Sequence, residues 1–228
     1  RKALNLAIDK NEIATIVLGD QVVPATGILP PGFPGFNPSI SGYEFDPEKA
    51  KQLLLESKYG DNLDDMPPIT ITTPGSFGAN VSLDMEVILA MWEKNLGIKT
   101  EFQQTEFATF LKDLNKRRFQ MFDIGWIADY PDPENFLDVL FYSDSSNNHT
   151  NYRSTKVDSL LEQARTESDE TLRFSIYSEV EQTILDDAPW IPLWYSGERY
   201  LLVKPNVRDY LQTPLIIPKL RHVYLTDK

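Results

Sequence analysis

Residues 69–103 read ITITTPGSFGANVSLDMEVILAMWEKNLGIKTEFQ, and this segment decides the predicted fold class. Its beginning, residues 69–73, is rich in β-branched side chains and precedes a proline, which favours a strand. Apolar residues then recur at three-to-four spacing as far as Gly97, which suits the left-handed position at a helix C-terminus. From Ile98 onward apolar and polar residues alternate, as in a second strand. The segment predicts a strand, a helix and a strand in succession.

Helices separated by a long loop are predicted on the N-terminal side of this unit. Residues 1–18 carry apolar side chains at helical spacing, which predicts one bent helix or two short ones. Residues 20–45 contain five prolines and four glycines, so we expect an extended surface loop there. Asp46-Pro47-Glu48 combines an N-cap, a first-turn proline and a first-turn acid, and therefore predicts the start of another helix.

Further helices and strands are predicted on the C-terminal side, in irregular alternation. Asp132-Pro133-Glu134 repeats the N-cap, proline and acid signature of a helix start. The absence of an internal repeat and the irregular order favour one domain of the α/β class (mixed α+β), with a mixed β-sheet flanked by helices. The apolar patterns predict helices over 107–114, 155–164 and 170–186, and strands over 119–128, 190–195 and 200–203.

Charge and composition exclude several classes of partner. The 34 acidic and 22 basic residues give a net charge of -12, which repels phosphate backbones and anionic bilayers, so nucleic acid is not an expected partner. No apolar run approaches the about 20 residues needed to cross a bilayer. The absence of cysteine excludes disulfides and thiolate chemistry. The first residues lack an initiator methionine and a signal-peptide pattern, so we expect a fragment of a longer protein.

The candidate ligand site is the segment GWIADYPDPENF, residues 125–136, where the strand predicted over 119–128 gives way to a helix. Such junctions hold ligands in many α/β proteins. A carboxylate beside aromatic faces binds an ammonium group by charge pairing and cation–π attraction. Asp129 is therefore the candidate acid, with Trp126 and Tyr130 as aromatic walls. A purely structural interpretation places Trp126 in the core and uses Asp129 to cap backbone amides.

Catalytic and metal-binding interpretations of these acids find less support. Asp129 and Glu134 can be proposed as paired carboxylates, but a sequence does not show their separation. Together with Asp132 they lack the glycine and the regular alternation of an EF-hand calcium loop. His149 and His222 are isolated, without the spacing of zinc ligands or of a catalytic triad. We therefore expect no enzyme activity, no bound metal and no cofactor.

Several segments, in order along the chain, resemble landmarks of the family 5 extracellular solute-binding proteins, which include dipeptide- and oligopeptide-binding proteins. The resemblance implies the substrate-binding component of an ABC importer, which captures peptides or similar small solutes in a cleft between two lobes. These segments span nearly the whole chain: RKALNLAIDK (1–10), LPP (29–31), FDPEKAKQLL (45–54), GW (125–126), ADYPDP (128–133), DSLL (158–161) and APWIPL (188–193).

The same resemblance implies an architecture and partners. Residues 1–228 are expected to form a single C-terminal lobe of a two-lobed periplasmic-binding-protein-like fold, with 205–228 as a tail that returns toward the N-terminal lobe. The chain would then carry one wall of the cleft. The implied partners are a peptide or small-molecule ligand and an ABC transporter permease. The implied location is extracytoplasmic, in the periplasm or as a cell-surface lipoprotein held by an N-terminal anchor, and we expect a monomer.

The resemblance also assigns ligand-binding residues. In oligopeptide binders, the aspartate of the Gly-Trp-x-x-Asp motif pairs with the peptide α-ammonium, which falls here on Asp129, with Trp126 lining the pocket. Some of them carry an arginine three residues before the motif tryptophan, where it can meet a peptide carboxylate; this chain has Asp123 there, so the resemblance does not extend to that contact. The candidate ligand-binding residues are Trp126, Asp129, Tyr130 and Asp123.

Two other functions stay open on the sequence. One is a carboxylate-dependent hydrolase that uses Asp129 and Glu134. The other is a protein-interaction domain without a small ligand, in which Trp126 belongs to the core or to an interface.

Overall fold

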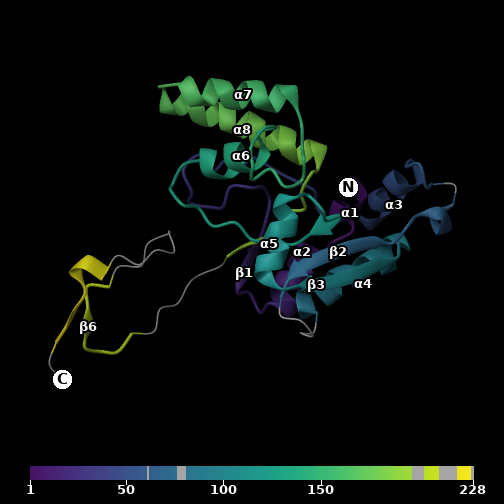
Figure 1. Cartoon of the computed structure of the whole chain (residues 1–228), viewed down its shortest axis with the longest axis horizontal. Coiled ribbons are helices and arrows are strands. Elements are labelled where there is room, and N and C mark those ends of the chain that lie inside the picture. Colours follow the sequence, from purple (N-terminus) through teal and green to yellow (C-terminus); the bar gives the residue numbers. More distant parts are fainter. Residues whose placement is uncertain (61, 76–80, 197–202, 211–219, 227–228) are drawn as a thin grey trace.

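The computed structural model describes residues 1–60, 62–75, 81–196, 203–210 and 220–226 (Figure 1). No helix in these ranges is both long enough and apolar enough to cross a bilayer. A π-helical turn covers Ile13–Val17, and 3-10 turns cover Leu63–Asp65 and Leu220–His222. The α-helices are α1 (Lys2–Leu6), α2 (Lys10–Glu12), α3 (Pro47–Leu55), α4 (Leu83–Leu96), α5 (Phe107–Asn115), α6 (Glu134–Phe141), α7 (Thr155–Thr166) and α8 (Glu170–Asp187). The strands are β1 (Val22–Pro24), β2 (Ile69–Pro74), β3 (Thr100–Thr105), β4 (Met121–Phe122), β5 (Trp194–Ser196), β6 (Val207–Arg208) and β7 (Tyr224–Leu225).

The predicted strand, helix and strand are confirmed by β2, α4 and β3. β2 pairs in parallel with β3 over its whole length, and its other side pairs in parallel with β4, where Ile71 lies opposite Met121. The strand order is β3-β2-β4, so β2 is central. α4 ends at Gly97 with φ +68°, a left-handed conformation that glycine adopts without a steric penalty.

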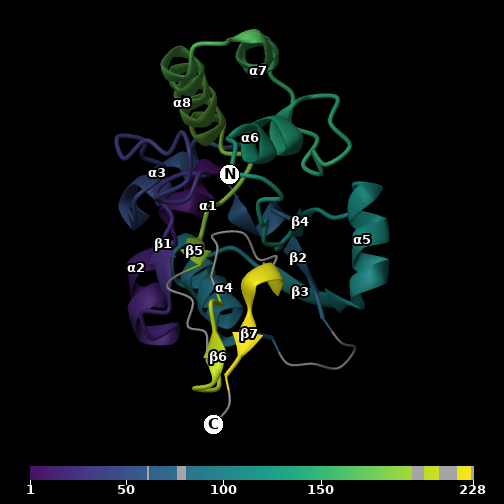
Figure 2. The same ribbon diagram turned by 90° about the vertical axis from the view of Figure 1, so that its left-hand side faces the viewer.

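The two crossover helices of this sheet lie on opposite faces, with α4 on one side and α5 on the other (Figure 2). The connection from β2 to β3 runs toward one edge of the sheet, and the connection from β3 to β4 runs back across it. Because parallel crossovers are right-handed, this reversal of direction moves α5 to the second face. The carboxyl ends of β2 and β4 therefore border a topological switch point, where open α/β sheets bind ligands.

The predicted helix boundaries on the N-terminal side are confirmed. Residues 1–18 form the two short helices α1 and α2 and the π-helical turn. α3 begins at Pro47, and the Asp46 carboxylate accepts the Lys49 backbone N–H at 2.9 Å. This bond satisfies one of the first-turn N–H groups that lack a partner within the helix.

Two hydrophobic clusters stabilise the described part of the chain. One surrounds the sheet and buries Ile71, Ile88 and Trp92 beside the N-terminal helices. The other lies among α6, α7 and α8, which are stacked together in Figure 1. α8 confirms the helix predicted over 170–186. Leu172 is four positions before Ile176 but is 55% exposed, because the buried cluster on this helix begins at Ile176.

The loop over 20–45 is bound to α8 by a buried carboxylate. The backbone N–H groups of Ile28 and Leu29 donate to the Glu181 Oε1 at 2.6 and 2.9 Å. The loop also contains β1, which the sequence did not predict and which pairs antiparallel with β5. The prolines of the loop exclude a regular helix, but they do not prevent this short pairing with a strand far along the chain.

A partly buried lysine predicts an unusual dependence of stability on pH. The Lys10 ammonium donates to the carbonyl oxygens of Ala25 and Pro192, and burial lowers its pKa to about 8, against the opposing charge of Glu44. The unfolded chain holds this proton more tightly, so the folded state gains up to about 3 kcal/mol as pH rises from 8 toward 10.5. Urea unfolding at several pH values should show this gain relative to Lys10→Met, which does not titrate. Parallel pH profiles for the two proteins would contradict the prediction.

The strand predicted over 119–128 is confirmed only as the two residues of β4, which are partly buried, so the prediction is wrong in length and in burial. Within this segment, only Met121 and Phe122, which form β4, pair with β2, and one further bond joins the Asp123 N–H to the Thr72 carbonyl oxygen at 3.2 Å. β4 is an edge strand, and no described strand lies on its outer side to continue the ladder. The chain therefore leaves the sheet after Asp123, and Ile124 and Ile127 are exposed.

Two smaller predictions also differ from the structure. The N-cap of α6 is Pro133 rather than Asp132. Asp132 lies one residue before the N-cap, where its carboxylate accepts the Glu134 N–H and is also bound by Arg173. The strand predicted over 190–195 is reduced to β5. The strand predicted over 200–203 falls, except for its last residue, outside the described residues.

Candidate functional site

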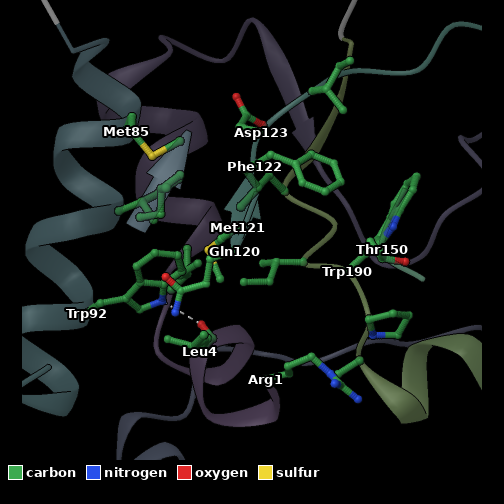
Figure 3. Close-up of a pocket in the computed structure, with 18 residues that line it drawn as sticks. Arg1, Leu4, Met85, Trp92, Gln120, Met121, Phe122, Asp123, Thr150 and Trp190 are labelled. Carbon is green, nitrogen blue, oxygen red and sulfur yellow. Dashed lines mark hydrogen bonds between the residues drawn. The ribbon is translucent and has the colours of Figure 1, made fainter. Parts of the chain in front are cut away.

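A cavity of about 240 Å³ lies beside β2 and β4, lined by Ile71 from β2 and by residues 120–124, which include β4 (Figure 3). The Trp92 indole N–H donates to the Leu4 carbonyl oxygen at 2.9 Å, so the polar edge of this ring is paired within the wall. The cavity is larger than the about 150 Å³ that accommodates benzene, so it has room for one side chain or small group of a ligand. Most of its walls are apolar and include Leu4, Ile71, Met85, Trp92, Met121 and Trp190.

Asp123 places a carboxylate at one end of this cavity, and Arg1 lies at the other end (Figure 3). Asp123 is exposed at the mouth of the cavity, but the atoms that surround its carboxyl partly desolvate it, which raises its pKa, and the negative charge of Asp84 raises that pKa further. The Arg1 guanidinium donates instead to the Asp187 carbonyl oxygen at 3.2 Å. Within the described ranges Asp123 forms no ion pair. The cavity thus joins apolar walls to an acidic end.

The loop over 125–135 is organised around the buried side chain of Asn135. Asn135 lies in the first turn of α6 and is 2% exposed. Its Oδ1 accepts the Trp126 indole N–H at 3.1 Å and the Asp129 backbone N–H at 3.2 Å. The Trp126 ring also packs against the helical cluster, so part of its role is structural. One amide side chain therefore sets the positions of both Trp126 and Asp129.

The Asp129 carboxylate itself is exposed to solvent. Its backbone N–H is bound by Asn135, but among the described residues no hydrogen bond or ion pair involves its side chain. The neighbouring Tyr130 is 39% exposed and donates its hydroxyl to the Glu134 Oε2 at 3.0 Å. No described backbone N–H donates to Asp129, which leaves the carboxylate open to a ligand cation.

Asp132 fixes the other end of this loop to α8. Its two carboxylate oxygens accept from the Arg173 guanidinium, each at 2.7 Å, and Oδ1 also accepts the Glu134 N–H at 3.0 Å. Burial alone would raise the pKa of Asp132, but the hydrogen bonds and charge of Arg173 and the Glu134 N–H lower it below its ordinary value. A bidentate pair of this kind holds both side chains in one orientation. The loop is therefore restrained by Asn135 along its length and by Arg173 where it meets α6.

The four candidate residues fall into two groups rather than one pocket. Asp123 lines the cavity, whereas Trp126, Asp129 and Tyr130 belong to the loop and do not line it. Both groups follow β4 in the chain, but Asp123 is still bonded to β2 through its backbone, whereas Trp126 packs against the cluster among α6, α7 and α8. The sequence indicated this region but not its division, because the chain leaves the sheet between Asp123 and Trp126.

Sequence reasoning missed Asn135 and the apolar walls of the cavity. Asn135 belongs to the segment 125–136, but nothing local distinguishes it from an ordinary residue of a first helical turn, since its partners lie six and nine positions earlier. The cavity walls come from residues as far apart as Leu4 and Trp190. No local pattern connects such positions.

Replacing Asn135 with alanine tests whether this side chain organises the loop. Two N–H groups lose their acceptor, which is expected to lower the free energy of unfolding by about 1–3 kcal/mol. The change should be measured by urea unfolding of the variant. Asn147→Ala is the control, because only backbone groups of Asn147 form described hydrogen bonds: its N–H donates to the Ser145 Oγ, and its carbonyl oxygen accepts the His149 N–H. Equal losses in the two variants would show that Asn135 has no special role.

The chain resembles known proteins over its whole length. The family model described as bacterial extracellular solute-binding proteins, family 5 middle, matches residues 1–148. Heme-binding protein A of Haemophilus influenzae is 32% identical over 220 residues, which cover 94% of this chain and 39% of that protein. Oligopeptide-binding protein OppA of Bacillus subtilis is 28% identical over 232 residues, which cover 100% of this chain and 41% of that protein.

The fold is also similar to solved structures. The periplasmic binding protein DppA from Helicobacter pylori, in complex with the peptide STSA, superposes with a TM-score of 0.83 at 26% identity. The match covers 98% of this chain and 43% of that one. The matched regions cover 39% of Heme-binding protein A and 41% of OppA of Bacillus subtilis, so the chain spans about 40% of the length of these two relatives.

Proposed function

This chain belongs to the bacterial extracellular solute-binding proteins of family 5, and from that premise we propose that it forms one wall of a cleft that captures peptides or similar small solutes for an ABC importer. The observation that carries the proposal is the exposed Asp129 carboxylate, which forms no bond to any described residue and whose backbone N–H is bound by Asn135 in the loop that follows β4. The carboxyl edge of the sheet borders the switch point where α/β sheets bind ligands. Asp123, which follows β4 at this edge, also lines the cavity.

Asp129 is the proposed anchor for the α-ammonium of a peptide. Its carboxylate accepts hydrogen bonds from a cation without first breaking a bond to any described residue. Trp126 and Tyr130 flank it in the sequence and supply aromatic surface, and both are partly engaged by Asn135 and Glu134. A ring restrained in this way loses little side-chain entropy when it contacts a ligand. Asp123 acts separately, in the cavity.

The proposed architecture is one lobe, residues 1–228, whose tail contacts the rest of the protein. β6 and β7 form an antiparallel pair that stands apart from both hydrophobic clusters (Figure 1). Tyr224 and Leu225 in β7 are 53% and 70% exposed. Apolar residues on so small a hairpin favour contact with another part of the protein, because two strands alone are barely stable in water. We place this contact in the remainder of the full-length protein.

Binding without chemical change is the proposed mode of action. Members of the family are solute-binding proteins, and the permease and ATPases of an importer supply transport. We place the protein outside the cytoplasm, as a monomer that delivers its solute to the permease. The hydrolase alternative requires Asp129 and Glu134 to act together, whereas Glu134 is engaged by the Tyr130 hydroxyl. Nothing in the described geometry favours that pairing over capture.

Native mass spectrometry of the full-length protein, purified from its own host, tests the proposal without prior choice of a ligand. A series of co-purified peptide masses is the expected result. A porphyrin mass would indicate that this protein binds heme, like the Heme-binding protein A of Haemophilus influenzae, and would overturn the proposal that the solute is a peptide. Incubation with a synthetic tetrapeptide is the second measurement. Recovery of the intact peptide is expected, and steady conversion to fragments would overturn binding without chemistry.

A further inference from the structure

The acidic end of the cavity lacks a counter-charge among the described residues. Asp123 lines the cavity and Asp84 is close enough to act on it electrostatically, so two negative charges influence the same opening. No described lysine or arginine pairs with either carboxylate. The guanidinium of Arg1 lies at the opposite end and is bound to a carbonyl oxygen (Figure 3). The nearest positive charge along the walls is therefore directed away from Asp123.

The walls below this acidic end are hydrocarbon and aromatic. Ile71 from β2, Met85 and Ile88 from α4, and Met121 from β4 line the cavity next to Asp123. The polar side chain of Gln120 is already used, because its Oε1 accepts the Thr70 N–H at 2.9 Å. A group that fits this environment needs an apolar stem of several carbons and a positive charge at one end. Lysine and arginine side chains have this construction.

We infer that the cavity receives a basic side chain of the captured solute, with its hydrocarbon stem against Met85, Ile88 and Met121 and its cationic group at Asp123. This inference rests on the proposed capture function and adds a preference among solutes. It concerns a second contact, separate from Asp129, which does not line the cavity. A peptide is thus held by its α-ammonium at Asp129 and by one basic side chain at Asp123.

The cavity is also large enough for an acidic or a purely apolar side chain, and charge complementarity favours the basic side chain over both. An acidic side chain would meet the like charges of Asp123 and Asp84. A purely apolar side chain would fill the walls but leave the Asp123 carboxylate without a partner when a closing cleft removes its water. A basic side chain satisfies both the walls and the carboxylate. The net charge of -12 also attracts cationic solutes at longer range.

The test compares matched tripeptides by isothermal titration calorimetry on the full-length protein, freed of solute by unfolding and refolding. Trialanine is varied at each position in turn with lysine, norleucine or glutamate, where norleucine keeps the four-carbon stem and removes the charge. At one position, lysine is expected to bind about 10- to 100-fold tighter than norleucine. Asp123→Asn should reduce this ratio to about one- to threefold, and Asp84→Asn should reduce it by a smaller factor. Asp65→Asn, the same substitution on an exposed residue that precedes β2, should leave the ratio unchanged.

The outcomes distinguish a failure of the proposed preference for basic side chains from a failure of peptide capture itself. A lysine to norleucine ratio near one at every position in the unaltered protein overturns the inference, while trialanine binding keeps peptide capture. A ratio that survives Asp123→Asn in a variant of normal circular dichroism also overturns it. Asp123→Lys provides a further check, since glutamate should then replace lysine as the preferred residue. Failure of every tripeptide, trialanine included, would overturn peptide capture itself and the inference with it.

Discussion

Replacing Asp129 with alanine in the full-length protein is expected to weaken peptide binding by roughly 30- to 3,000-fold. The substitution leaves the loop in place, because Asn135 binds the Asp129 backbone N–H and not its carboxylate. The effect is large because an ammonium enclosed by a closing cleft keeps its desolvation cost when its partner is removed. Isothermal titration calorimetry with a tripeptide of free amino terminus measures the loss.

Two controls assign this loss to the proposed contact. An N-acetylated copy of the tripeptide lacks the ammonium, so it should bind the unaltered protein weakly, and Asp129→Ala should weaken it little further. Asp144→Ala removes another exposed carboxylate, whose contact with Arg153 spans 3.7 Å, and should change affinity by no more than about twofold. Equal affinity of the Asp129→Ala variant and the unaltered protein for the free peptide would exclude Asp129 from the site.

Replacing Glu181 with alanine is expected to lower the free energy of unfolding by about 3–5 kcal/mol. Glu181 is 2% exposed, and its Oε1 accepts two consecutive backbone N–H groups, of Ile28 and Leu29. Alanine leaves both donors buried without an acceptor and opens space between α8 and the loop over 20–45. Urea unfolding followed by circular dichroism gives the change in free energy.

A conservative variant and a neighbouring one test the cause of this destabilisation. Glu181→Gln keeps an acceptor oxygen and should lose less than half as much stability, whereas Glu179→Ala, also on α8, removes only an exposed contact with Lys156. If Glu179→Ala costs as much as Glu181→Ala, the two N–H bonds do not explain the effect. Burial raises the pKa of the Glu181 carboxyl, so the folded state binds a proton more tightly than the unfolded chain. Stability from this group therefore falls as pH rises through its folded-state pKa, and Glu181→Gln should lack that slope.

Helices and strands could be predicted wherever the signal was local. Gly97 ends α4 because a left-handed residue is needed there, and Asp46 caps α3 through a bond to a residue three positions later. The strand over 119–128 could not be predicted correctly in the same way. Its apolar composition suits a buried strand, but pairing depends on a neighbour, and β4 has a described neighbour only on the β2 side.

The candidate site shows the same division. The segment 125–136 was identified from its acid and aromatic residues, and it lies between β4 and the start of α6, where a junction of strand and helix was predicted. The separation of Asp123 from Asp129 could not be predicted, because it depends on where the chain leaves the sheet. Asn135 could not be recognised either, since its importance comes from burial and from two donors on another part of the loop.

By itself, the sequence determined the strand, helix and strand around β2, the helix caps, the acidic charge and the motif that carries Asp129. These features depend on residues a few positions apart or on composition, and neither changes when the chain folds. Only the tertiary structure decided that β2 is central, that Glu181 binds the loop over 20–45, and that an apolar cavity ends at Asp123. Each of these depends on burial and pairing between residues far apart in the chain, and such contacts exist only after the elements have packed together.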